Sequence, residues 1–370
     1  MKKKQILSLA IVTAILGALV YFQFRSWQTF DWAKFRQYTG GVNRWHIGAG
    51  VALIYLAYVL RAIRWAIFLK PTAPTKVRRL IAPQMIGFAA LGLFGRAGEF
   101  ARPYLIARKE KLTFTSQLAV WTVERFFDLG AVALLMGGFL ALRGGTLAHV
   151  LMQAVRSGVH VALQNAGHKL PFALAALAVL ALLAFLLKRA SGTAAAHLRA
   201  RLLVFKQGFN TIHDAKSFAQ LVLVSLCMWL MIAGAYIEVL HAYPQIPVVA
   251  AGDPPGVQRV ARMNSMGLED VLLVMGSSIL GSVVQLPGGV GGSQLAVIGV
   301  LQSNLFRNEP FNITRELAVS CGIMLWLVTF MSVIPAGVLL ARFEKISFLQ
   351  LNEESTKQEE AVEATAARTH

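Results

Sequence analysis

The stretch of sequence that decides the fold runs from residue 80 to residue 111 and reads LIAPQMIGFAALGLFGRAGEFARPYLIARKEK. Its first half, residues 80–94, is apolar and uncharged, and a basic cluster follows it, as basic residues 61–79 precede it. Basic residues stay on the cytoplasmic side of a membrane, so two such clusters cannot flank one spanning helix. We therefore expect a re-entrant hairpin that enters from the cytoplasm, breaks at residues 95–98 and returns through residues 99–107.

The composition of the whole chain supports a membrane setting for this hairpin. Of 370 residues, 56% are hydrophobic and only 15% are charged, which departs strongly from soluble domains. Several apolar runs are near or at the length that crosses about 30 Å of hydrocarbon. The net charge of +18 lies in short clusters between these runs, so it reports membrane topology and gives no reason to expect nucleic acid as a partner.

The distribution of charge also orders the remaining spans. Lys2, Lys3 and Lys4 place the N-terminus in the cytoplasm, and no small-residue cleavage site follows the first apolar run, so we expect an uncleaved span. Because successive spans cross the membrane in opposite directions, we expect most of the 36 Lys and Arg residues, and both termini, on the cytoplasmic side of the plasma membrane. The expected full spans are residues 6–24, 46–69, 113–142, 171–187, 217–243 and 318–341.

A second break, LPGGVGG at residues 286–292, separates two apolar segments that are each short for a span. We expect a hairpin here that enters from the outside. The predicted fold is an all-α polytopic membrane protein with about six full transmembrane helices and two opposed re-entrant hairpins, in the form of an inverted repeat. The membrane domain covers residues 1–342, and residues 343–370 are predicted to be a disordered acidic cytoplasmic tail.

Ionisable residues in the middle of a span are costly, which makes Glu124, Arg125 and Asp128 candidates for a functional site. Glu124 and Asp128 lie on one helical face, where two carboxylates repel each other unless a cation lies between them. Arg96, Arg102 or a substrate cation could fill that role. The alternative is an internal salt bridge that only joins this helix to the first hairpin.

Two further groups of arginines could bind phosphate. Arg96, Glu99 and Arg102 place charges at the first break, and a guanidinium group grips phosphate through two parallel hydrogen bonds. An ordinary basic surface loop is the alternative. Arg61 and Arg64 form a face that could meet a lipid phosphate, but we favour the interpretation that they extend to the membrane interface.

The second break offers backbone and neutral groups. Gly288, Gly289 and Gly291 permit close backbone approach to a substrate, and Gln294 supplies a neutral hydrogen-bonding group. A plain packing turn between helices is an equally good interpretation. The sequence shows no nucleotide-binding motif and no metal-ligand spacing, so we expect neither a cofactor nor a metal.

Four motifs together resemble the transmembrane domain of the lysylphosphatidylglycerol synthase and flippase family over about residues 46–341. The resemblance implies a helical bundle that translocates aminoacylated or other anionic phospholipids, or related lipid-linked molecules, between the leaflets. It also implies that Arg96, Glu99 and Arg102 lie at the first break and that Glu124, Arg125 and Asp128 support it. Where many members carry Glu, this chain has Gln294, which argues against a cationic head group there. The motifs are Arg61-x-x-Arg64-Trp65, Gly95-Arg96-x-Gly98-Glu99-x-x-Arg102, Glu124-Arg125-x-x-Asp128 and Pro287-Gly288-Gly289-Val290-Gly291.

These observations predict a lipid flippase or translocase whose partner is a membrane phospholipid with an anionic head group. One alternative is a membrane transferase acting on a lipid-linked substrate, with Glu124 or Asp128 as the base. Another is a non-catalytic membrane partner of a separate lipid synthase or transferase. The full-length synthases of the family append a large soluble domain, and no segment of that size follows residue 341, so we do not expect an enzyme.

Overall fold

The computed structural model describes residues 30–142, 215–248, 259–282, 291–351 and 353–358, and the chain is mostly helical there. One small antiparallel sheet pairs Pro247 with Val260. The elements are α2 (Trp32–Gly40), α3 (Arg44–Leu69), α4 (Val77–Phe94), η1 (Gly95–Phe100), α5 (Ala101–Glu110), α6 (Phe114–Leu142), α10 (Ala215–His241), β1 (Ile246–Val248), β2 (Arg259–Ala261), η3 (Met263–Ser265), α11 (Leu268–Gly281), α12 (Gly292–Leu301), α13 (Asn304–Arg307), α14 (Arg315–Trp326), the π-helical η5 (Leu327–Met331) and α15 (Val333–Phe343).

Four helical segments in the described part are long and apolar enough to cross a membrane: α3, α4, α10 and the continuous run from Arg315 to Phe343. Helix α6 is 29 residues long and equally apolar apart from three ionisable residues in its middle. The chain is therefore a multi-pass membrane protein. The predicted spans at residues 6–24 and 171–187 lie outside the described residues.

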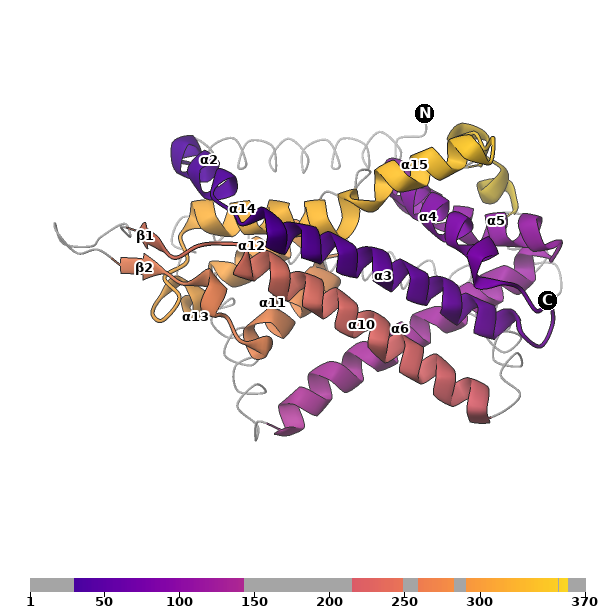
Figure 1. Ribbon diagram of the computed structural model, residues 1–370, viewed down its shortest axis with the longest axis horizontal. Coiled ribbons are helices and arrows are strands. Elements are labelled where there is room, and N and C mark those ends of the chain that lie inside the picture. Colours follow the sequence, from indigo (N-terminus) through magenta and orange to yellow (C-terminus); the bar gives the residue numbers. More distant parts are fainter. Residues whose placement is uncertain (1–29, 143–214, 249–258, 283–290, 352, 359–370) are drawn as a thin grey trace, which may run out of the picture.

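Helices α3 and α10 form the centre of the bundle. They run side by side, and α6 crosses α10 (Figure 1). Gly50 permits close packing of α3, because a Cβ atom at this position would lie 3.2 Å from Val328 of η5 and 3.5 Å from the Ala235 carbonyl oxygen of α10. The largest apolar core collects side chains from α3, α10, α11, α12 and α14.

The first predicted break is confirmed as a fold-back of the chain. Helix α4 ends at Phe94, and the next residue, Gly95, has a φ of 63°, which glycine adopts without strain. The short 3₁₀ segment η1 then leads into α5. The open ends of the two arms meet where Arg79 Nε donates to Glu110 Oε1 at 2.9 Å. Helices α4 and α5 therefore form a hairpin.

The second fold-back brings α11 and α12 together, and residues 283–290 between them lie outside the described residues. The arms approach closely at their turn ends, where a Cβ atom on Gly281 would lie 2.1 Å from the Gly292 carbonyl oxygen. Gly291 has a φ of 138° at the start of α12, and Gln294 Oε1 accepts from its backbone N–H at 2.9 Å. Figure 1 shows the α4–α5 hairpin toward one end of α3 and the α11–α12 hairpin toward the other.

The structure differs from the expected disordered tail over residues 343–358. Helical residues 348–351 and 353–358 follow α15, and Leu351 is buried in an apolar cluster with residues of α4 and α5. The Tyr104 hydroxyl donates to Glu354, and Lys109 pairs with Glu344. The apolar residues before the acidic run and these polar contacts order the segment against α5. The rest of the tail, residues 359–370, lies outside the described residues.

The packing of the first hairpin predicts that Gly98→Ala is destabilising. A Cβ atom at residue 98 would lie 2.2 Å from the Ala90 carbonyl oxygen, so the backbone of α4 has to move. We expect a loss of about 1–3 kcal/mol in the free energy of unfolding, measured in mixed micelles. The control Gly48→Ala, in α3 where no described atom lies within 4 Å of such a Cβ atom, should be neutral or slightly stabilising. Equal stabilities of the two variants would contradict the packed hairpin.

Candidate functional site

The candidate site is built around the ionisable residues in the middle of α6. Glu124 is 0% exposed and Asp128 is 6% exposed. Their spacing of four residues places both carboxylates on one face of the helix, as the sequence predicts. Two neighbouring buried carboxylates require positive partners, and the surrounding helices supply them.

Arg64 of α3 lies between the two carboxylates. It is 0% exposed, and its two terminal nitrogens donate to different acids: Nη2 to Glu124 Oε1, and Nη1 to Asp128 Oδ1 at 2.6 Å. Nη1 also donates to Ser225 Oγ of α10 at 3.0 Å. One guanidinium group thereby joins α3, α6 and α10.

Arg102 adds the first hairpin to this network. Its Nη2 donates to Glu124 Oε2 at 2.6 Å, and its Nη1 donates to Glu124 Oε1 at 3.2 Å and to Gln84 Oε1 of α4 at 3.1 Å. The guanidinium group also lies over the ring of Trp65, 4.9 Å from its centroid. Trp65 is itself fixed, because its Nε1 donates to Gln117 of α6 at 2.9 Å. We call Arg64, Arg102, Glu124 and Asp128 the charge cluster.

Arg61 and Arg125 lie at the edge of the charge cluster and are less tightly paired. Arg61 Nη1 is 3.9 Å from Glu124 Oε1, and its guanidinium group lies over the rings of Tyr58 and Phe88. Arg125 Nη2 is 3.2 Å from Asp128 Oδ2, yet 40% of its side chain is exposed. These two arginines can therefore meet a further anion without losing the structure of the cluster.

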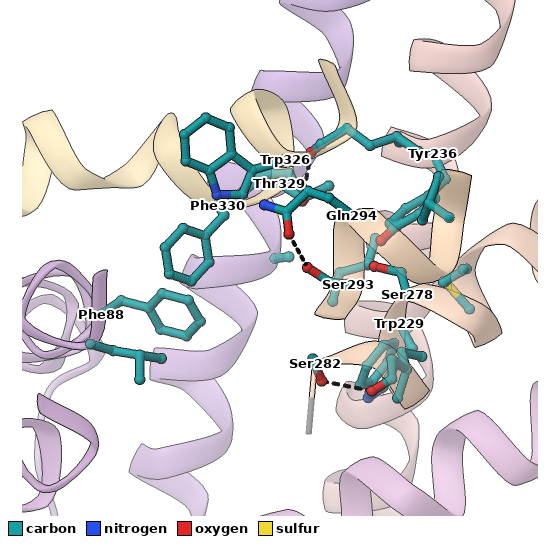
Figure 2. Close-up of a pocket in the computed structure, with 18 of the residues that line it drawn as sticks. Phe88, Trp229, Tyr236, Ser278, Ser282, Ser293, Gln294, Trp326, Thr329 and Phe330 are labelled. Atoms are coloured by element: carbon teal, nitrogen blue, oxygen red, sulfur yellow. Dashed lines mark hydrogen bonds between the residues drawn. The ribbon is translucent and has the colours of Figure 1, made fainter. Parts of the chain in front are cut away.

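Both arginines line a cavity of about 360 Å³. Its lining residues come from an N-terminal half of the molecule (α3, α4, η1 and α6) and from a C-terminal half (α10, α11, α12, α14 and η5). Helix α3, η1 and α6 contribute its charged residues, Arg61, Glu99 and Arg125. Helices α11 and α12 contribute neutral polar residues, and Figure 2 shows Ser278, Ser293 and Gln294 grouped on that wall. The aromatic lining residues are Tyr58, Phe88, Trp229, Tyr236, Trp326 and Phe330.

The cavity therefore places two arginines and one glutamate inside a bundle of apolar helices. Trp229 contacts both the cavity and the charge cluster. Its side chain lines the cavity, and its Nε1 donates to Asp128 Oδ1 at 3.3 Å. A family model described as the lysylphosphatidylglycerol synthase TM region matches residues 5–337. The chain belongs to this family.

Searches of the curated proteins and of the solved structures found no match. Membership in the lysylphosphatidylglycerol synthase TM family indicates a membrane function related to lipids.

The structure brings together most of the predicted site residues. Six of them, from three segments of the chain, lie in or beside the charge cluster: Arg61, Arg64, Arg102, Glu124, Arg125 and Asp128. Glu99 and Gln294 line the same cavity. Gly291 starts α12, whereas Gly288 and Gly289 lie outside the described residues. The backbone of Arg96 lies in η1, and its side chain is not described.

One interpretation from the sequence was wrong. Arg64 does not extend to the membrane interface, because it is completely buried and paired with two carboxylates. Arg61 is also buried, at 9% exposed. The predicted salt bridge between this helix and the first hairpin is present between Glu124 and Arg102, whereas the pairing of both acids with Arg64 of α3 was not predicted. Arg61 and Arg125 are the arginines that line the cavity.

Sequence reasoning missed the neutral partners of the cluster. Gln84, Gln117 and Ser225 are each at most 1% exposed and bind its members or Trp65. A polar amide or hydroxyl within an apolar run is the signal that could have identified them, since a membrane interior leaves such a group without water.

The charge cluster predicts that Glu124→Gln is strongly destabilising. The substitution keeps the shape but removes the negative charge between Arg64 and Arg102, which leaves buried positive charge uncompensated. We expect the free energy of unfolding to fall by about 3–5 kcal/mol.

The control is Glu344→Gln, which makes the same chemical change in a pair with Lys109 whose side chains are 31% and 28% exposed. Its cost should be about 0–1 kcal/mol. Unfolding in mixed micelles measures both, and a similar small loss for the two variants would refute the structural role of Glu124.

Proposed function

We propose that this chain translocates an anionic lipid between the two leaflets of the plasma membrane. The observation that carries the proposal is the 360 Å³ cavity between the two halves of the bundle, with Arg61 and Arg125 on its wall. The head-group phosphate would bind these arginines inside the protein while the acyl chains remain in the membrane.

The electrostatics of the site favour an anion. The described side chains of the charge cluster, its edge and the cavity include four guanidinium groups, those of Arg61, Arg64, Arg102 and Arg125, and three carboxylates, those of Glu99, Glu124 and Asp128. A surplus of positive charge inside a membrane protein is costly unless a negative group approaches it. Guanidinium groups bind phosphate oxygens in a bidentate manner, so a lipid phosphate fits this surplus.

The helix architecture around the cavity supports a transport role. Helices interrupted at corresponding places in two halves mark the substrate sites of many transporters. Here Glu99 of the first hairpin and Gln294 of the second reach one cavity. Thr329 and Phe330, from the π-helical segment, line it as well, and such segments occur frequently at functional sites.

We do not propose a transferase reaction. The oxygens of Glu124 and Asp128, the two carboxylates considered as bases, accept hydrogen bonds from arginines and Trp229, so neither is presented to a substrate hydroxyl. The same contacts argue against a proton-carrying role for either acid. The proposed movement is downhill, and a separate lipid synthase would supply the gradient.

The orientation in the membrane follows from charge. The end of the bundle where α3 meets the first hairpin is basic, and we propose that it faces the cytoplasm together with both termini. Its described basic residues are Lys70, Lys76, Arg78, Arg79, Arg108, Lys109 and Lys111.

Substitution of Arg125 tests the proposal. In proteoliposomes that contain a fluorescent anionic phospholipid, Arg125→Gln should slow leaflet exchange by about tenfold or more, since a hydrogen bond to a charged group contributes about 1.5–3 kcal/mol. Asp128 keeps its bond to Arg64, so the fold should persist. Reduction of outer-leaflet fluorophores by dithionite measures the exchange.

The matched control is Arg108→Gln. This arginine lies outside the cavity lining, its side chain is 66% exposed, and its 3.9 Å pair with Glu354 contributes little. Exchange by this variant should equal that of the unmodified protein. If Arg125→Gln and Arg108→Gln both exchange lipid at the unmodified rate, the cavity is not the transport site.

A further inference from the structure

The walls of the cavity differ in chemistry, and the neutral wall bears on the identity of the head group. The described lining residues from α11, α12, α14 and η5 carry no charged side chain. A cationic group placed against this wall would have no opposite charge to compensate the loss of water.

The hydroxyl groups of this wall are arranged to accept hydrogen bonds. Ser293 Oγ donates to Gln294 Oε1 at 3.0 Å, Ser282 Oγ donates to the Ile279 carbonyl at 2.6 Å, and Thr329 Oγ1 donates to the Leu325 carbonyl at 2.7 Å. Each hydroxyl has one hydrogen and two lone pairs, so its hydrogen is used within the protein and the oxygen can still accept a hydrogen bond from a ligand in the cavity. The matching ligand group is a neutral donor, namely a hydroxyl.

The charged wall limits the charge of the ligand. Among the described side chains, the guanidinium groups of the cluster and its edge exceed the carboxylates of Glu99, Glu124 and Asp128 by a single positive charge. A phosphodiester carries one negative charge, so it neutralises this excess. A lipid with a phosphodiester and an additional ammonium group leaves the excess in place.

We propose that the substrate is a phosphodiester lipid with an uncharged polyhydroxyl head group, such as glycerol or a sugar, and that Arg61 and Arg125 bind its phosphate while Ser282, Ser293 and Thr329 accept from its hydroxyls. This inference rests on the proposed lipid translocation and specifies the substrate class of that same cavity. Gln294 determines the selectivity, because it keeps the neutral wall uncharged.

The experiment compares three lipids with identical labelled acyl chains in proteoliposomes of the full chain: phosphatidylglycerol, phosphatidylethanolamine and lysylphosphatidylglycerol. We expect phosphatidylglycerol to exchange about fivefold faster or more than either amine-bearing lipid, which corresponds to about one hydrogen bond. Gln294→Glu retains acceptor oxygens for Gly291 and Ser293, so it should fold normally. It should shift the preference toward lysylphosphatidylglycerol.

Gln350→Glu is the control for the added charge, because Gln350 is exposed and outside the cavity lining, and its lipid preference should be unchanged. Equal exchange of all three lipids, or an unchanged preference in Gln294→Glu, would overturn the assignment of the head group. If either of these results is obtained while Arg125→Gln still slows lipid exchange, the proposed translocation is supported but the proposed head-group selectivity is wrong. If no lipid exchanges above protein-free vesicles, the proposed function itself fails.

A soluble phosphodiester could supply the same chemistry, and deacylated glycerophosphoglycerol separates the two sources. As a competitor of phosphatidylglycerol exchange it should be weaker by about tenfold or more, because it cannot bury acyl chains against the apolar lining. Complete inhibition at a concentration equal to that of the lipid would overturn the lipid assignment.

Discussion

The buried hydrogen-bonded pairing of Arg64 with Glu124 and Asp128 is the interaction on which the rest of the structure depends. It joins α3 to α6, reaches α10 through Ser225, and holds the first hairpin through Arg102. Burying charges is expensive, and such a network is weak evidence for added stability, but breaking it leaves uncompensated charge in the membrane interior. The network therefore fixes how these four segments meet.

A division of roles among the arginines follows from this pairing. Arg64 and Arg102 are committed to the carboxylates, whereas Arg61 and Arg125 keep donor capacity at the wall of a cavity. Because the opposite wall comes from the second hairpin, any relative movement of the two halves would change access to a ligand held there. The lysylphosphatidylglycerol synthase TM family supplies the lipid context, and the two walls supply the chemistry.

The sequence predicts the parts of this site whose signals are local. The break after Phe94, the carboxylate spacing in α6 and the second break near Gly291 are visible as glycines and charges within apolar runs. The burial of Arg64 is not visible, because its partners lie 60 and 64 residues away and an arginine near the end of a span ordinarily extends to the interface. The ordered segment around Leu351 was missed for the same reason, since α4 and α5 provide the surface that buries it.

The central claim is that a lipid phosphate binds in the cavity at Arg61 and Arg125, and not at the charge cluster. An experimental structure of the full chain in nanodiscs rich in phosphatidylglycerol tests it most directly. We predict head-group density with its phosphate within hydrogen-bonding distance of Arg61 and Arg125, and with Glu124 still bound to Arg64 and Arg102. A phosphate that displaces Glu124 from Arg64, or a cavity closed by its own side chains with lipid bound only on the outer surface, would contradict the account.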